Sequence, residues 1–119
     1  MTIKKSKNEL QNHSVFCKAI KQMPLNDFKK RFKGTVFYLV YNNNKIVGLV
    51  TITDRNEIGY GIIEQFRRKN LAKDAIKELM IKEKRPYYWS LIDKNNEVSM
   101  KFIQSLGFVP RGIVYGYNT

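Results

Sequence analysis

The sequence has 119 residues, of which 43% are hydrophobic and 27% are charged. This length suits one domain, and the composition is that of a folded globular protein rather than a disordered tail. The longest uncharged apolar run, residues 46–52, is far shorter than the ~20 residues that span a bilayer. The polar N-terminus also lacks the apolar core of a secretion signal. We therefore expect a cytoplasmic protein that makes no membrane contact.

The chain contains one cysteine, Cys17, and one histidine, His13. A single cysteine excludes an internal disulfide, and one residue of each type argues against a zinc site of the Cys/His kind. His13 lies in a polar, Lys-rich stretch, which also argues against a Ser-His-Asp triad. We expect Cys17 to be a small buried residue on a helix, not a nucleophile.

The balance of charges is strongly positive. Twenty-two Lys and Arg against ten Asp and Glu give a net charge of +12, and the first 34 positions hold nine basic and two acidic residues. Such a field attracts anions: nucleic acid, an acidic protein or a phosphorylated cofactor. A composition that is merely rich in Lys and Asn is the alternative, so charge alone does not identify the function.

In chain order, apolar spacing first predicts two helices, which are broken at Pro24 and end before Gly34. Residues 35–41 and 45–53 flank an Asn-Asn-Asn turn and are rich in β-branched and aromatic residues, which predicts a hairpin. Residues 57–63 predict a third strand. Its two glycines indicate a bulge or a close approach to the backbone.

Helical spacing then predicts an amphipathic helix over residues 71–82. Residues 87–92 predict a buried strand, with Tyr88 on the opposite face from its neighbours. Asn95 or Asn96 can cap a second helix that ends at Gly107, and residues 108–117 predict a final strand. This order of elements predicts an α/β (or α+β) layer with a mixed sheet.

Residues 62–72 leave a strand, cross a short basic loop and enter a helix. Unpaired N–H groups and the positive end of the dipole make such a helix start an anion site that suits a diphosphate. Arg67, Arg68 and Lys69 add positive charge, Asn70 tolerates a left-handed backbone, and Ala72 leaves room for a ligand. The alternative is an ordinary basic helix start, in which the cations would oppose the dipole.

The Arg-x-x-Asn-x-Ala sequence at residues 67–72 resembles the acetyl-coenzyme A signature of the GCN5-related N-acetyltransferases (GNAT), usually written Gln/Arg-x-x-Gly-x-Gly/Ala. The run over residues 57–72 looks most like the branch that acetylates ribosomal-protein N-termini and small amines. Asn96-Glu97-Val98-Ser99, with Gly107-Phe108 after it, is similar to the family's second block. The resemblance covers residues 35–113. It implies a mostly antiparallel GNAT-like sheet with helices on both faces, shortened at both ends.

The resemblance implies acetyl-CoA as the cofactor. The strand that ends at Ile63 would splay from residues 87–92, and the pantetheine arm would pair with the backbone of Ile62, Ile63 and Glu64. The pyrophosphate would lie on the amides of Arg68, Lys69, Asn70, Leu71 and Ala72, close to the charge of Arg67. Asn96, and with it Ser99, would contact the coenzyme from the opposite helix.

The reaction implied is direct attack of a primary amine on the thioester. Glu57 is the candidate general base, acting through water, and a solvated strand-end carboxylate is the alternative reading. Many family members have a tyrosine four residues after the serine as the acid, but that position is Ile103 here. The proton would then come from water, Ser99 or a nearby tyrosine. Because the chain has few carboxylates, we expect a protein amine rather than a highly cationic small amine.

We expect residues 1–119 to form a single domain, with a basic helical part over residues 1–34 and the acetyl-CoA-binding core over residues 35–113. The family's first strand is not evident before residue 34 and its last is cut off after Tyr117, so a homodimer could complete the sheet. The alternative function is a weak or inactive binding module that contacts nucleic acid or an acidic protein. The basic patch for such a contact would be Lys18, Lys21, Lys29, Lys30, Arg31 and Lys33.

Overall fold

The computed structural model describes residues 1–67 and 70–117. In this part of the chain, four strands form an antiparallel sheet in the order β1-β2-β3-β4. The strands are β1 (Thr2–Ser6), β2 (Val36–Asn42), β3 (Lys45–Ile52) and β4 (Ile58–Ile62). The helices are α1 (Glu9–Ala19), α2 (Leu25–Arg31), α3 (Leu71–Lys82) and α4 (Glu97–Ser105), and a short 3-10 turn, η1 (Glu64–Phe66), follows β4.

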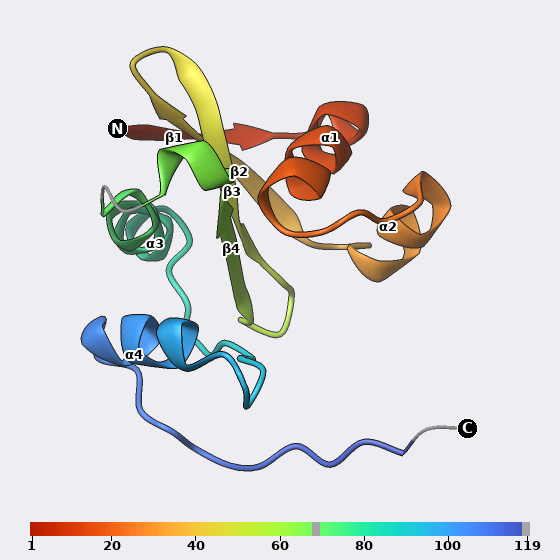
Figure 1. The fold of residues 1–119 in the computed structure, drawn as a ribbon. Coiled ribbons are helices and arrows are strands. Elements are labelled where there is room, and N and C mark those ends of the chain that lie inside the picture. The colour runs from red at the N-terminus through yellow and green to blue at the C-terminus, as the bar shows by residue number, and fades with distance from the viewer. Residues whose placement is uncertain (68–69, 118–119) are drawn as a thin grey trace.

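Helices cover both faces of the sheet (Figure 1). Helices α1 and α2 bury one face, in a core formed by Val15, Phe16, Ala19, Phe28, Phe37, Leu39 and Leu49. Helices α3 and α4 bury the other face, and their core includes Val50, Ile52, Ile58, Ile76, Leu79 and Ile103. Alternate side chains of β2 enter opposite cores, as the two-residue period of a strand requires, and in β3 this alternation is interrupted at Val47, where the register with β2 shifts. The mostly antiparallel α/β fold expected from the sequence is therefore confirmed.

Most of the predicted elements are present. The break between α1 and α2 contains Pro24, the β2–β3 turn places Asn43 and Asn44 at positive φ, and α4 begins after the cap residue Asn96. Gly107 follows α4 with a φ of 96°, as a helix-ending glycine does. Within the described residues, no helix is both long and apolar enough to cross a bilayer.

Strand β1 contradicts the expectation that no strand precedes residue 34. It pairs antiparallel with β2, with Ile3 opposite Val40. Only Ile3 is buried among its five residues, so the strand carries almost no hydrophobic alternation in its sequence. Pairing with β2, and not local propensity, defines this strand.

Two predicted strands differ in the structure. Residues 87–92 form a single parallel bridge, between Glu57 and Trp89, instead of a full strand. Residues 108–117 form no strand in the described part of the chain, and most of them are exposed. Figure 1 shows this segment leaving α4 as an extended chain. Its β-rich composition finds no neighbouring edge there, and a strand requires a partner.

The glycines of β4 permit a close approach by α1. The β3–β4 register runs without a break from Gly48–Ile62 to Ile52–Ile58, so β4 has no bulge. A Cβ on Gly61 would lie 2.5 Å from Cγ1 of Ile20, the residue that ends α1. The close contact expected from the sequence is thus made by a helix of the same chain.

Candidate active site

Strand β4 and residues 87–92 meet at one end and then separate. The Ile58 amide donates to the Trp89 carbonyl at 2.7 Å, and the Trp89 amide donates to the Asn56 carbonyl at 3.2 Å. The Ser90 hydroxyl donates to the Ile58 carbonyl at 2.9 Å. Beyond these contacts, no backbone hydrogen bond joins the two segments within the described residues. The sheet therefore has a parallel pair that is closed at its start and open further along.

The open edge of β4 is formed by Tyr60 and Ile62. On the β3 side, Thr53 donates to the Glu57 carbonyl at 3.0 Å and Ile63 donates to the Val47 carbonyl at 2.8 Å. Backbone groups of successive strand residues point to opposite sides, so Tyr60 and Ile62 direct theirs away from β3, as Ile58 does. This edge is suited to pairing with an extended ligand.

Two residues predicted to share this edge have main-chain groups that are engaged elsewhere. The Ile63 carbonyl accepts from Phe66 at 2.8 Å, in addition to the amide bond to β3, and the Glu64 carbonyl accepts from the Arg67 amide at 3.2 Å. Ile62 lies on the edge, but its carbonyl accepts from Arg67 Nε at 2.8 Å, so its pairing with a cofactor stays a prediction. Tyr60, which the sequence did not single out, provides more of the edge than Ile63 or Glu64.

Helix α3 begins without a side-chain cap. Asn70 has a φ of 56° and a ψ of 18°, the left-handed conformation, and its side chain makes no capping hydrogen bond. Its carbonyl accepts the first helical bond, from Asp74, at 3.1 Å. The first-turn amides, at Leu71 and Ala72, have no acceptor among the described residues. Arg68 and Lys69 lie outside the described residues.

The Arg67 side chain is bound to the protein itself. Its Nε donates to the Ile62 carbonyl at 2.8 Å and its Nη2 donates to the Ala19 carbonyl at 3.2 Å. The guanidinium thus connects the end of β4 with the end of α1. A contact between Arg67 and a cofactor stays a prediction.

A pocket of about 480 Å³ lies beside the closed end of this divergence. Its walls come from β4, from residues 90–93, from the start of α4 and from α1 and α2. It brings together both predicted catalytic residues, Glu57 and Ser99, and the predicted cofactor residue Asn96. The Asn96 side chain also caps α4, because its Oδ1 accepts from the Ser99 amide at 3.0 Å.

Tyr60 lines the same pocket and has a buried hydroxyl. The ring centroid lies 5.2 Å from that of Phe102 on α4. The hydroxyl has no hydrogen-bond partner among the described residues. Burial raises the pKa of Tyr60, and the neighbouring Ser99 hydroxyl lowers it by a smaller amount. The sequence does carry one signal for this residue: Tyr60 is an aromatic residue with a hydroxyl group, and it lies between the two glycines of its strand.

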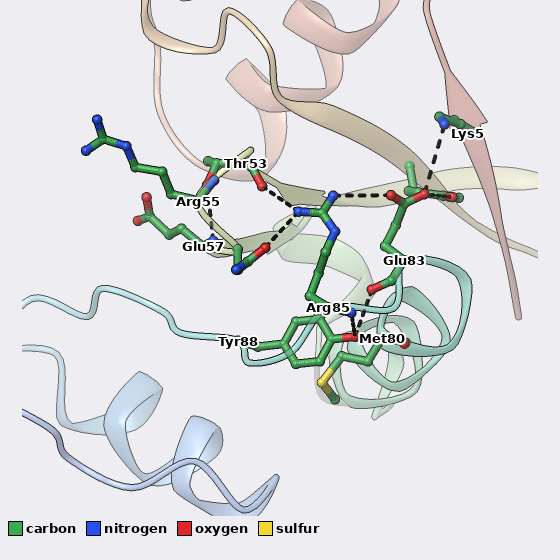
Figure 2. Close-up of polar contacts among 10 residues, drawn as sticks. Lys5, Thr53, Arg55, Glu57, Met80, Glu83, Arg85 and Tyr88 are labelled. Carbon is green, nitrogen blue, oxygen red and sulfur yellow. Dashed lines mark hydrogen bonds and ion pairs between the residues drawn. The ribbon is translucent and has the colours of Figure 1, made fainter.

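A polar network fixes the closed end of the divergence (Figure 2). The Arg85 Nη1 donates to the Thr53 carbonyl at 3.1 Å and to Asn56 Oδ1 at 2.9 Å. The Arg85 amide donates to the Tyr88 hydroxyl at 3.1 Å, and that hydroxyl lies 2.7 Å from the Glu83 carbonyl oxygen. Arg85 therefore ties the segment after α3 to the β3–β4 turn, a role that no local sequence pattern indicates.

Tyr38 and Glu83 extend this network to β2. The Tyr38 hydroxyl donates to Glu83 Oε2 at 2.7 Å, and Arg85 Nη2 lies 3.4 Å from Glu83 Oε1. Burial, together with the neighbouring Glu83 carboxylate, raises the pKa of Tyr38 to about 12. The hydrogen bond from Tyr38, followed by the Arg85 and Lys5 charges, lowers the pKa of Glu83 despite its burial. Figure 2 shows the Glu57 side chain pointing away from this network.

Solved structures with a similar fold include several N-acetyltransferases. The aminoglycoside N-acetyltransferase AAC(6')-Iy, in complex with the bisubstrate analogue CoA-S-monomethyl-acetylneamine, is 15% identical with a TM-score of 0.79, over 99% of this chain and 97% of that one. The aminoglycoside 6'-N-acetyltransferase AAC(6')-IG from Acinetobacter haemolyticus is 17% identical with a TM-score of 0.78, over 100% and 99% of the two chains.

The ribosomal-protein-S18-alanine N-acetyltransferase from Escherichia coli is 16% identical with a TM-score of 0.75, over 93% of this chain and 79% of that one. At these identities the similarity establishes the fold. No curated protein matches the sequence significantly.

A family model described as "Acetyltransferase (GNAT) family" matches residues 8–108. The match includes both sequence blocks and all of the elements that surround the divergence. The expected acyltransferase class agrees with this family, and the expected cofactor agrees with the coenzyme A bound in AAC(6')-Iy. The chain therefore belongs to the acetyltransferase (GNAT) family.

Proposed function

We propose that this protein transfers an acetyl group from acetyl-CoA to a primary amine of a protein. The observation that carries the proposal is the opening of the sheet directly beyond the Ile58–Trp89 hydrogen bond. The opening leaves the edge of β4 without a neighbouring strand. This edge leads to the start of α3, which has no side-chain cap.

The residues present fit the cofactor. The backbone of Tyr60 and the amide of Ile62 offer an extended ligand an edge to pair with, as an added strand would use it, while the Ile62 carbonyl is bound by Arg67. The free amides of Leu71 and Ala72, preceded by the left-handed Asn70, suit a diphosphate. Bound acetyl-CoA would supply the acetyl group as an activated thioester. We keep the other predicted cofactor contacts, Ile63, Glu64, Arg67, Arg68, Lys69 and Asn96, as part of the proposal.

The protein contributes mainly position and proton transfer. The pocket walls hold an amine beside the edge of β4, which makes the attack effectively intramolecular. The Glu57 carboxylate lines this pocket, and the Glu57 amide is held by Thr53 Oγ1 at 3.1 Å. Through a water molecule, Glu57 would take a proton from the ammonium form of the acceptor, because only the neutral amine attacks. The Ser99 hydroxyl would face the reaction from the start of α4.

The charges around the pocket favour a single amine on a flexible chain. Two carboxylates, Glu57 and Asp93, line it together with two cations, Lys21 and Arg31. A polycationic small molecule would meet the cations as well as the carboxylates. A protein N-terminus or a lysine side chain brings one positive charge, and the surrounding basic surface suits an acidic polypeptide.

Calorimetric titration with acetyl-CoA at low and moderate salt tests the cofactor. We expect binding in the micromolar range, and no detectable binding at millimolar ligand would overturn the proposal. Turnover is then compared between acidic peptides with a free N-terminus, the same peptides with a blocked N-terminus, and an aminoglycoside. Faster acetylation of the aminoglycoside would contradict the assignment of the acceptor and leave the assignment of the cofactor standing.

A second candidate is a binding module that contacts nucleic acid, and one observation favours it. All six residues of the predicted basic patch are exposed on and around α1 and α2: Lys18, Lys21, Lys29, Lys30, Arg31 and Lys33. Phe28 and Phe32 instead pack in the core beneath them. If this function holds, the affinity for DNA or RNA falls steeply with salt and is lost when the basic residues are replaced by Gln. Weak binding without salt dependence would contradict it.

We also propose that the protein forms a homodimer. Four large apolar residues after α4 are between 74% and 90% exposed in the monomer: Ile113, Val114, Tyr115 and Tyr117. A second copy could cover them. Analytical ultracentrifugation tests this, and a monomer at micromolar concentration would overturn it.

A further inference from the structure

We propose that the pocket beside β4 selects an amine that has an acidic side chain close to it, and that Arg31 and Lys21 bind this side chain. The inference rests on the proposed acetyl transfer and deepens it, because it names a sequence feature of the acceptor. The acceptor would be a protein amine with Asp or Glu only a few residues away.

The pocket has charges of opposite sign on two different walls. Both of its cations belong to the helical wall: Lys21 lies between α1 and α2, and Arg31 is the last residue of α2. Both of its carboxylates belong to the sheet wall: Glu57 immediately precedes β4, and Asp93 follows the segment that bridges to Glu57. An acceptor whose ammonium group faces the carboxylates meets the cations with the part of its chain next to the amine.

These charges are largely unused within the protein. Lys21, Arg31 and Glu57 form no ion pair within the described residues, so the two walls are not joined across the pocket. Asp93 is partly engaged, because its Oδ1 accepts from the Asn95 amide at 2.8 Å. Opposite charges that line one space without pairing are left for a ligand, and a ligand with one charge of each sign satisfies both walls.

Phe32 holds the Arg31 guanidinium at the pocket. The Arg31 Cζ lies 5.5 Å from the centroid of the Phe32 ring, and Phe32 also lines the pocket. The core fixes this ring in turn, because its centroid lies 5.0 Å from that of Phe16 and 5.7 Å from that of Phe37. A guanidinium over an aromatic ring keeps its fork of N–H donors, which matches a carboxylate. Arg31 is therefore the main determinant, and Lys21 adds charge beside it.

The size of the pocket sets how close the acidic side chain must be to the amine. A roughly spherical space of 480 Å³ is about 10 Å across, which an extended chain covers in about three residues at ~3.4 Å each. An acid at the second or third position thus reaches the helical wall while the amine faces Glu57. An acid much further along the chain lies outside the pocket and meets only the general basic surface.

The test compares three peptides that differ in one acid. The first has Asp at position 2, the second has Asn there, and the third has Asn at position 2 and Asp at position 8. With the wild-type protein, we expect kcat/KM for the first to exceed that for the second by about fivefold, the upper end for an ion pair in contact with water. The difference should lie in KM, because the acid is bound equally before and during the reaction. The third peptide should stay close to the second.

A second set of peptides distinguishes the two sources of the amine. These peptides have a blocked N-terminus and one internal Lys, with Asp or Asn beside it or with Asp displaced by six positions. A preference for the near acid in either set supports the inference and shows which amine is used. No preference for the near acid in either set would overturn it.

Variants of α2 assign the preference to Arg31. Arg31→Gln should abolish it, and Arg31→Glu should reverse it, so that a peptide with Lys near the amine becomes the better substrate. Lys30→Glu is the matched control, because Lys30 is exposed on the same helix and does not line the pocket. It makes the same change in net charge and should keep the wild-type order. If Arg31→Glu and Lys30→Glu behave alike, only the general field acts and the inference is overturned.

Peptide binding gives a measurement without turnover. Fluorescence polarisation of the same peptides, labelled at the C-terminus and in the presence of coenzyme A, should show about fivefold tighter binding with the near acid. The difference should shrink as salt is added, and equal affinities at low salt would overturn the inference.

The two proposals fail in different ways. If the wild-type protein acetylates all of the peptides equally well, only the selection of a nearby acid is wrong. If it acetylates none of them, the proposed function is wrong, and the polarisation measurement still decides whether the pocket recognises an acidic side chain.

Discussion

The amide of Ile58 donates to the carbonyl of Trp89 at 2.7 Å, and this bond marks the point where two parallel segments of the sheet separate. On one side of it, Arg85 and Tyr88 hold the segments together through side chains. On the other side, the Tyr60 backbone and the Ile62 amide make no hydrogen bond to a neighbouring strand, while the Ile62 carbonyl accepts from Arg67 Nε. The position of this single bond therefore sets how much of β4 is left for a ligand.

Replacement of Arg85 by Ala should destabilise the closed end. The side chain is 22% exposed and donates to the Thr53 carbonyl and to Asn56 Oδ1. Because these donors are charged and partly buried, we expect a loss of about 2–4 kcal/mol in the free energy of unfolding. Denaturant unfolding measures it. The exposed neighbour Lys84, replaced by Ala, is the control and should cost less than ~0.5 kcal/mol. Equal effects of the two variants would show that the network contributes nothing.

Replacement of Gly61 by Ala should strain the contact between β4 and α1. The new Cβ would lie 2.5 Å from Cγ1 of Ile20, and overpacking of this kind costs about 1–3 kcal/mol. Adding Ile20→Ala should restore part of the loss, because Ile20 is 44% exposed and contributes little by itself. Gly48→Ala should not be rescued in this way, since its Cβ would collide with the Gly61 carbonyl. Thermal unfolding of all four variants checks both statements, and a full loss in the Gly61/Ile20 double variant would contradict the first.

Asn70 should tolerate Gly and reject Val. At a φ of 56°, glycine relieves the left-handed strain, whereas a β-branched side chain adds about 1–2 kcal/mol. We expect Asn70→Gly to bind acetyl-CoA at least as tightly as wild type and Asn70→Val to bind it at least tenfold more weakly. Asn44, which has a φ of 63° in the β2–β3 turn, provides the control. Asn44→Val should lower stability without a change in Kd, and a similar loss of cofactor affinity there would refute a local role for Asn70.

The Tyr38–Glu83 pair should contribute stability that depends on pH at both ends of the scale. The folded-state pKa of Glu83 is lowered, so its contribution is present above its ordinary value of 4.5 and is lost as the pH falls below it. The folded-state pKa of Tyr38 is raised from 10.0 to about 12, so its contribution is complete below pH 10 and is lost between pH 10 and about 12. Unfolding free energies measured across pH should show both slopes.

Two variants test whether the pH dependence of the unfolding free energy comes from the Tyr38–Glu83 pair. Glu83→Gln should flatten the acid slope, and Tyr38→Phe should flatten the alkaline one. Glu78, whose side chain makes no ion pair or hydrogen bond within the described residues, is the control for the acid side as Glu78→Gln. An acid slope that survives in Glu83→Gln and vanishes in Glu78→Gln would disprove the assignment.

The local sequence was sufficient for elements whose side chains follow the period of their own structure. Helix α3 occupies residues 71–82 as its apolar spacing indicated, and the Asn-rich turn joins β2 and β3 as expected. Strand β1 could not be foreseen, because it exists through pairing with β2 and has Ile3 as its single buried residue. Residues 108–117 show the converse, since β-rich composition does not create a strand where no edge is available.

The same distinction holds for the candidate site. The start of α3 was predictable because its signal, a basic loop followed by Asn70 and a helix, is contiguous in the sequence. The positions of Tyr60 and Arg85 in the site were not predictable, because they depend on residues far along the chain. Tyr60 packs against Phe102, and Arg85 donates to Thr53 and Asn56. Arg67 was singled out for its charge, whereas its guanidinium bonds to two carbonyls that only the fold brings together.

The order of the strands has a practical consequence for the laboratory. Because β1 and β4 occupy opposite borders of the sheet, the first residues of the chain emerge on the side away from the opening beside β4. An affinity tag or fluorophore fused ahead of Met1 would therefore lie at the β1 edge of the sheet. It would not block the access of a ligand to the opening beside β4. A fusion at the other terminus would prolong the chain that follows α4, next to the helix that carries Ser99.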